Sequence, residues 1–290
     1  MSTKVLSAVI LALAIVLGSV TASYVFVLDK PHQTIVTSSL VAQEGDTVAV
    51  DYVGMFSDGK VFDTSIQTVA NNNAVYPKAL SFAPKVAYSP LNFTIGSGTM
   101  IKGFDLGVRG MRPNETKTIT VSPANGYGTP DPTKIITRPL RMSAPVLEVV
   151  YNETDFKTAY NVTATIGAHV VSNLWHWNAT VQYVDPQGMV TVKNEPFIGE
   201  TFPFGDGLWR SKVVSIDESA NGGKGVIVFE HQLSQSDVGK IKGEDLTMGT
   251  YILSGVDRAA GTYTVDFNNE PVGKTLTFQI TLLSITKKAA

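Results

Sequence analysis

Alternation between apolar and polar side chains is the feature that most constrains how this chain can fold. Residues 48–54 (VAVDYVG) change character at every second position, which is the period of a strand with one buried face. Twenty-five glycines and many Val, Thr and Ile residues accompany this pattern, and they favour strands joined by tight turns. The chain is therefore expected to be mostly β.

Length, charge and cysteine content exclude several classes of function. A chain of 290 residues is long enough for two modest domains. The formal net charge of -2 lacks the excess of basic residues that nucleic-acid binding requires, so no nucleic-acid partner is expected. Cysteine is absent, which excludes disulfides, thiol catalysis and cysteine-ligated zinc.

The N-terminal part of the chain predicts a membrane anchor. Residues 5–28 form an apolar run of 24 positions without a charged side chain. As a helix this run spans roughly 36 Å, enough to cross a ~30 Å hydrocarbon core with some tilt. We expect residues 1–29 to be a transmembrane helix, with a cleaved signal peptide as the alternative because residues 20–22 (VTA) offer a small-residue cleavage pattern. Either reading places the soluble domains outside the cytoplasm, and the first makes the chain a single-pass protein of the cell membrane.

Beyond a short polar tether at residues 30–42, the pattern predicts one small antiparallel sheet with one helix. Apolar residues recur at spacings of three and four, which indicates a short helix packed on the sheet, at Ile101, Phe104, Val108 and Met111. Residues 66–90 lose all periodicity and contain three prolines, so a long loop is expected there. Strands are expected at residues 48–54, 61–62, 91–95, 117–121 and 276–285. The expected class is α+β, mostly β, with a twisted antiparallel sheet wrapped on a short helix.

Residues 129–262 contain an internal echo. The segment 177–185 (WNATVQYVD) aligns with 209–217 (WRSKVVSID), and an alternating strand follows each, at 189–195 and at 225–230. Two similar hairpins would give a compact β-rich unit. The patterning that all β-hairpins share could also produce the match without a duplication.

Four short segments, in this order, resemble the FKBP-type peptidyl-prolyl cis/trans isomerases. They are residues 59–65 (GKVFDTS), 96–104 (GSGTMIKGF), 125–128 (NGYG) and 273–280 (GKTLTFQI). Each alone would be a weak signal, and together they are fairly specific. The last stands about 140 residues further on than in a compact member of the family. The resemblance therefore implies the SlyD-like branch: an FKBP-like isomerase domain at residues 43–128 plus 263–287, interrupted in its flap by a chaperone domain at 129–262.

Prolyl isomerisation needs a fitted pocket and no nucleophile. The bond between a residue and proline turns over a barrier of ~18–20 kcal/mol, because the planar amide loses its resonance in the twisted state. An apolar pocket that removes water from the amide, with groups that fit the twisted form, lowers this barrier. No cofactor and no metal site is expected, and a His-rich metal-binding tail of the SlyD-like kind is missing, since the chain ends in TKKAA.

The resemblance also assigns site residues. Phe104 takes the floor of the pocket, a position that is often Trp in the family, and Tyr127 offers its hydroxyl to the bound peptide. Asp63 stands at the rim, and the backbone N–H of Ile101 is a second peptide contact. The remaining residues expected to line the pocket are Tyr52, Phe62, Leu91, Met100 and Phe278. Without the motifs, the same aromatic residues could be only a hydrophobic core, and Asp63 could cap a turn through its own backbone.

The expected function is that of a membrane-anchored isomerase (rotamase) and chaperone assisting the folding of exported proteins, with unfolded or proline-containing polypeptides as its substrates. One alternative is a non-catalytic FKBP-like binding or chaperone protein of the cell envelope. Another is a structural protein of the envelope, which would explain the anchor but not the pocket motifs. A prolyl isomerisation assay distinguishes the first reading from the other two.

Overall fold

The computed structural model describes residues 40–289. The predicted anchor at residues 1–29 and most of the predicted tether lie outside this part. No helix within residues 40–289 is long and apolar enough to cross a membrane. The last residue of the predicted tether belongs to the folded domain. Ala42 is buried, and its backbone N–H donates to the carbonyl of Met111.

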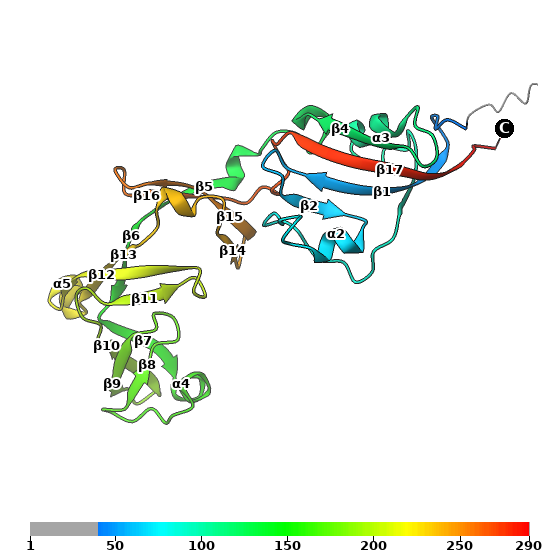
Figure 1. The fold of residues 1–290 in the computed structure, drawn as a ribbon. Helices are drawn as coiled ribbons and strands as arrows, with labels where there is room; N and C mark the ends of the chain where they lie inside the picture. Colours follow the sequence, from blue (N-terminus) through cyan, green and yellow to red (C-terminus); the bar gives the residue numbers. More distant parts are fainter. Residues whose placement is uncertain (1–39, 290) are drawn as a thin grey trace, which may run out of the picture. The chain divides into compact units, whose positions relative to one another are not determined.

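One five-stranded antiparallel sheet is built from the two ends of the described chain (Figure 1). Its strands lie in the order β2-β1-β17-β4, and β3 also pairs with β1. The bounds are β1 Thr47–Met55, β2 Val61–Thr64, β3 Leu91–Thr94, β4 Thr116–Val121 and β17 Leu276–Thr286. Helix α3 (Lys102–Val108) packs on this sheet. The strands and the helix expected from the sequence are all present.

Two glycines allow α3 to lie close against β4. A Cβ atom at Gly103 would lie 2.5 Å from Val121 Cγ1, and one at Gly107 would lie 2.4 Å from Ile119 Cδ1. The two glycines are four residues apart, so they share one face of the helix. Their lack of a side chain lets the helix lie close to the sheet and thereby sets the position of the neighbouring Phe104, which packs on Phe278 of β17.

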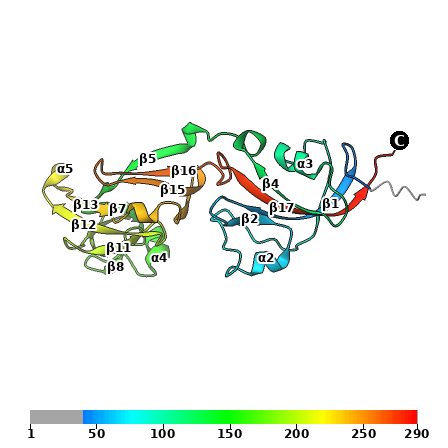
Figure 2. The same cartoon turned by 45° about the horizontal axis from the view of Figure 1, so that its top comes forward.

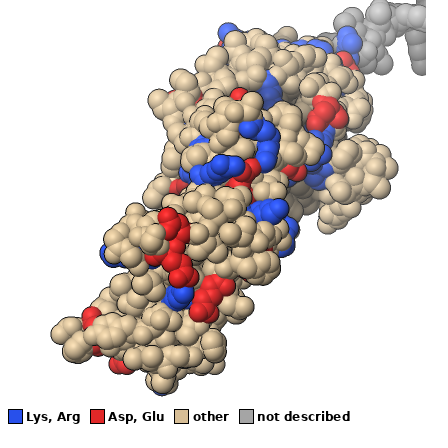
Figure 3. Space-filling model, turned by 90° about the vertical axis from the view of Figure 1, so that its left-hand side faces the viewer, with Lys and Arg blue, Asp and Glu red and all other residues tan. Residues whose placement is uncertain are grey.

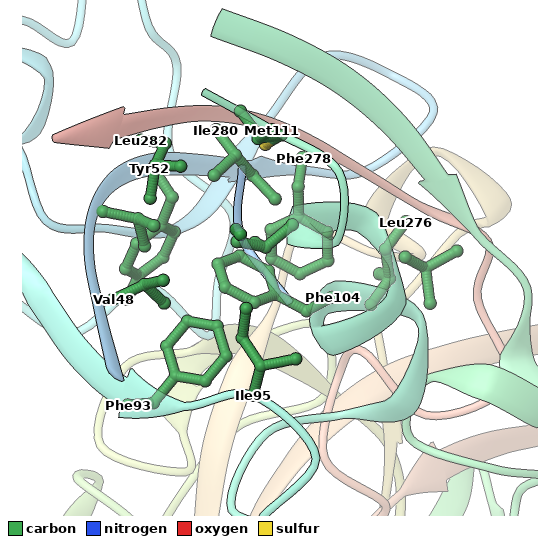
Figure 4. Packing of buried hydrophobic residues seen from close by; sticks show 14 of the residues in the cluster. Val48, Tyr52, Phe93, Ile95, Phe104, Met111, Leu276, Phe278, Ile280 and Leu282 are labelled. Carbon is green, nitrogen blue, oxygen red and sulfur yellow. The ribbon is translucent and has the colours of Figure 1, made fainter. Parts of the chain in front are cut away.

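The apolar core of this sheet is largely aromatic at one end (Figure 4). Val48, Val50 and Tyr52 project from one face of β1, as the alternation predicted, and all three are buried. Phe278, Ile280 and Leu282 alternate in the same way on β17.

The predicted loop at residues 66–90 is wrong in its first part. Helix α2 (Gln67–Asn71) forms there and buries Val69 in a small cluster with Val53 and Val61. The helix has five residues, too few for a helical period to emerge from the sequence. The rest of the segment has no regular structure.

Residues 129–272 form three further antiparallel sheets of four strands each (Figure 1, Figure 2). Their orders are β7-β10-β9-β8, β6-β13-β12-β11 and β5-β16-β15-β14, so all three have the same topology. Strands β5 (Ile135–Pro139), β6 (Arg141–Pro145) and β7 (Leu147–Asn152) follow one another along the chain, and each joins a later meander of three strands. The meander strands are β8 His169–Val171, β9 Asn178–Val184, β10 Met189–Asn194, β11 Thr201–Phe204, β12 Trp209–Asp217, β13 Val226–His231, β14 Lys242–Asp245, β15 Gly249–Asp257 and β16 Thr262–Asp266.

The three meanders repeat one another in detail. Their middle strands β9, β12 and β15 each shift register directly after a fully buried residue, which is Val181, Val213 or Leu253. The carbonyl of each of these residues accepts a hydrogen bond from a glycine with positive φ, at Gly167, Gly199 and Gly239. A bulge held at the same point in three sheets is a repeated structural feature.

The sequence echo is part of this repeat. Residues 177–185 and 209–217 fall on β9 and β12, which occupy equivalent places. A third copy at β15 was not predicted, because its sequence (residues 249–257, GTYILSGVD) shares little with the other two. The unit expected to hold two hairpins therefore holds three meanders. Helix α4 (Glu153–Tyr160) and the short helix α5 (Ala220–Gly223) are inserted between its strands.

The first sheet has a hydrophobic cluster of its own, whereas Phe204 of β11 packs against two of the three clusters in residues 129–272. The boundary expected at residue 263 falls inside β16, whose partners β15 and β5 belong to the sheets of residues 129–272. The chain returns to the first sheet at Gly273, whose N–H donates to the carbonyl of Gly128 at 2.9 Å. The two ends of the intervening segment therefore meet.

Candidate functional site

A cavity of about 330 Å³ opens on the first sheet and is lined by nine residues. Strands β1, β2, β3 and β17 contribute one residue each, and the turn before α3, the helix itself and the turn after β4 contribute the others. The lining residues are Tyr52, Asp63, Leu91, Thr99, Met100, Ile101, Phe104, Tyr127 and Phe278. Eight of them are among the nine residues that the sequence predicted.

Phe104 is fixed at the base of this cavity by three other rings (Figure 4). Its ring centroid lies 5.2 Å from that of Phe278 and 5.7 Å from that of Tyr52, both in edge-to-face geometry. Phe93 approaches to 5.8 Å. Such pairs add to the energy of area burial, and Phe104 is only 3% exposed. The floor of the cavity is therefore rigid and apolar.

Phe62 and Thr99 differ from the expectation. Phe62 does not line the cavity; it stacks on Phe56 at 4.9 Å and meets the edge of Phe278 at 5.6 Å. Its ring thus supports the wall from behind. Thr99 does line the cavity and was not predicted. The sequence contained one indication of this position: Thr99 lies between Gly98, which has a positive φ, and Met100, within the motif segment 96–104.

The polar rim contains one carboxylate. Asp63 Oδ2 accepts the hydroxyl hydrogen of Tyr52 at 2.5 Å, and Asp63 Oδ1 accepts the backbone N–H of Thr64 at 2.8 Å. Asp63 lies within β2, so it does not cap a turn as one interpretation of the sequence had it, and its side chain stands at the cavity. Burial raises the pKa of Tyr52 far above its ordinary value, and the hydrogen bond to Asp63 adds to the rise.

Tyr127 is placed differently from Tyr52. Its side chain is 45% exposed at the cavity mouth. Burial of the rest of the ring raises the pKa of Tyr127, and the charge of Asp63 raises it further. Within residues 40–289 its hydroxyl makes no hydrogen bond. The phenol is therefore protonated at neutral pH and available to a ligand as a donor.

Ile101 supplies a second available donor. It precedes the first turn of α3, and its carbonyl accepts hydrogen bonds from the N–H groups of Phe104 and Asp105. In the described part of the chain its own N–H has no partner. A largely aromatic pocket with two donors at its mouth can hold an apolar ring and bind carbonyl oxygens beside it.

Comparison with known proteins matches this part of the chain to one family. Residues 39–139 match the family model described as FKBP-type peptidyl-prolyl cis-trans isomerase. Over these residues the chain is therefore similar to an FKBP-type domain. The match ends at β5, whereas the sheet that carries the cavity is completed by β17 with Phe278.

The curated relatives match over the same part of the chain. A short-type peptidyl-prolyl cis-trans isomerase of Methanocaldococcus jannaschii is 42% identical over 102 residues, which are 35% of this chain and 60% of the relative. FK506-binding protein 2 of Aspergillus oryzae is 35% identical and covers 35% of this chain and 60% of the relative. FK506-binding protein 1A of Neurospora crassa is 36% identical, covering 30% and 56%. The chain thus spans somewhat more than half of these relatives.

A solved structure gives no further support. The structure titled "Crystal structure of AtFKBP13" is 28% identical and aligns over 33% of this chain and 66% of its own, with a TM-score of 0.23. That score is too low to support an argument about the fold.

Proposed function

We propose that the protein is a peptidyl-prolyl cis/trans isomerase acting on proline-containing polypeptides. The observation that carries the proposal is the cavity. An aromatic floor at Phe104, an apolar wall at Phe278 and two available donors at Tyr127 and Ile101 meet there. The match of residues 39–139 to the FKBP-type family supports the same conclusion.

The residues of the cavity suffice for this reaction without covalent chemistry. The proline ring rests on Phe104, where the apolar surface removes water from the amide. The Tyr127 hydroxyl and the Ile101 N–H hold peptide carbonyls on either side, which fixes the peptide while the bond turns. The twisted amide has lost its resonance and carries less charge on its carbonyl oxygen, so an apolar site disfavours it less than it disfavours the planar forms.

The test is a prolyl isomerisation assay on residues 43–290 with a Leu-Pro tetrapeptide, read by protease coupling or by NMR exchange. We expect catalysis that rises linearly with protein concentration. Tyr127→Phe, which leaves the buried core intact, provides the control for the site. Binding of the peptide without any acceleration would instead favour the alternative, a non-catalytic FKBP-like binding protein.

We further propose that residues 129–272 hold unfolded chains near this site. Apolar side chains that are more than half exposed support the proposal, and they gather in and beside the sheet of β7 to β10: Val149, Ile166, Val171, Leu174, Tyr183, Phe197 and Ile198. Figure 3 shows charged side chains in clusters with wide uncharged areas between them. Exposed apolar surface of this kind is unusual unless it binds a partner. The proposal predicts that the protein suppresses the aggregation of a reduced, unfolded protein. A variant with Leu174 and Phe197 changed to Ser should lose this effect. An unchanged effect in that variant would contradict the proposal.

We propose that the chain is anchored in the cell membrane by residues 5–28 with the soluble part outside the cytoplasm. The uncharged run of 24 residues supports this placement. Protease added to intact cells should then digest residues 40–289. Protection in intact cells, with digestion only after lysis, would reverse the assignment.

A further inference from the structure

A single lysine connects the irregular segment after α2 to the rim of the cavity. Lys85 Nζ forms an ion pair with Asp63 Oδ1 at 2.8 Å, and it donates hydrogen bonds to the carbonyl of Thr64 at 2.8 Å and to the hydroxyl of Tyr52 at 3.1 Å. It also lies 5.4 Å from the centre of the Tyr52 ring. An ammonium group has three N–H donors and no acceptor, so Lys85 can only donate to the oxygen atoms around it.

This arrangement sets the charge at the rim. Among the described residues that line the cavity, Asp63 alone carries a charge. Lys85 compensates that charge from outside the lining. Both side chains are about 40% exposed, at 39% for Lys85 and 41% for Asp63, so the ion pair contributes little to folding stability. Its main consequence is that the mouth of the pocket is close to neutral.

The same arrangement commits the Tyr52 hydroxyl. Lys85 can only donate, so the Tyr52 oxygen accepts from it and gives its one hydrogen to Asp63. Tyr52 has no hydrogen left for a substrate. The donors open to a peptide at this site are then the Tyr127 hydroxyl and the Ile101 N–H, as described above.

We propose that Lys85 is a specificity-determining residue that lets the site accept an acidic residue directly before proline. This inference rests on the proposed isomerase function. With Lys85 in place, a Glu-Pro or Asp-Pro peptide meets a neutral rim. Without it, the uncompensated carboxylate of Asp63 repels an acidic side chain and attracts a basic one.

Three peptides that differ only before proline test the proposal on the full chain: Glu-Pro, Gln-Pro and Lys-Pro. Glu and Gln have nearly the same shape, so their kcat/KM ratio isolates charge. In Lys85→Met we expect the Glu/Gln ratio to fall about tenfold at low salt, and the Lys/Gln ratio to rise. The change should shrink as salt screens the rim. Lys85→Arg keeps the charge and should stay close to the wild-type ratios.

Lys60→Met is a matched control, because Lys60 forms an ion pair of similar exposure with Asp58 at 2.9 Å and does not reach the cavity. It should leave all three ratios unchanged. Asp63→Asn combined with Lys85→Met should restore the Glu/Gln ratio, because both charges are then gone.

Two outcomes overturn the proposal. If Lys85→Met lowers kcat/KM by the same factor for all three peptides, Lys85 only supports the segment structurally. The second outcome concerns binding alone. If Lys85→Met shifts the Kd values of the three peptides equally, as measured by NMR titration, Lys85 does not select peptides by charge when they bind. Loss of the proposed function looks different, since the wild-type chain would then accelerate none of the peptides while its Kd values could still depend on charge.

Discussion

Removing the hydroxyl of Tyr127 tests the site with little disturbance of the fold. In the described chain this hydroxyl has no protein partner and the side chain is 45% exposed. Tyr127→Phe therefore leaves no buried polar group unpaired, and we expect the free energy of unfolding to change by less than about 0.5 kcal/mol.

Activity should respond where stability does not. A neutral hydrogen bond to the substrate contributes about 0.5–1.5 kcal/mol, so kcat/KM for a Leu-Pro tetrapeptide should fall about two- to tenfold. If the bond forms equally in ground and transition states, the change appears in KM, and if it strengthens in the twisted state, it appears in kcat.

Tyr52→Phe is the contrasting variant. It removes a buried hydroxyl that donates to Asp63 and accepts from Lys85, so we expect a loss of about 1–3 kcal/mol of stability, measured by urea unfolding. If kcat/KM for the Leu-Pro tetrapeptide is unchanged in Tyr127→Phe, the Tyr127 hydroxyl does not donate a hydrogen bond to the substrate and the assignment is refuted.

The remaining predictions concern the core, the pH response and the intervening segment. Phe104→Ala should cost about 3–5 kcal/mol in urea unfolding, because its ring is almost fully buried, whereas Phe104→Trp should retain activity. Burial lowers the pKa of His231 from 6.5 to about 4; its contribution to stability is thus complete above pH 6.5 and lost as the pH falls toward 4. That contribution should be about 2 kcal/mol smaller at pH 5 than at pH 7, a slope that His231→Gln removes. Replacing residues 129–272 by a short turn between Gly128 and Gly273 should keep turnover of tetrapeptides but slow the refolding of a proline-limited protein, and equal refolding rates would exclude a holding role.

Elements with a strong local period were predictable from the sequence. The alternation in β1 and the apolar spacing around Phe104 each reflect which face of one element is buried, and that information is contained in neighbouring residues. The order of the four motif segments indicated the pocket as well, and eight of its nine lining residues were anticipated.

Strand pairing decided which aromatic rings face the cavity and which lie behind its wall. Phe62 and Phe278 both belong to strands that neighbour β1, and both alternate inward. Their register places Phe278 at the cavity and Phe62 behind it. Register between strands more than 200 residues apart is not encoded in either strand alone.

The sequence by itself determined that the chain is strand-rich, that an aromatic pocket forms beside one short helix, and that a second β-rich segment interrupts it. Only the tertiary structure decided that this segment is three meanders of one topology, because the third copy keeps the bulge and the buried Leu253 but little of the sequence. Only the tertiary structure, too, brought Lys85 to Asp63. A lysine in an irregular segment gives no local signal, since its role depends on where the chain path places its ammonium group relative to a carboxylate 22 positions away.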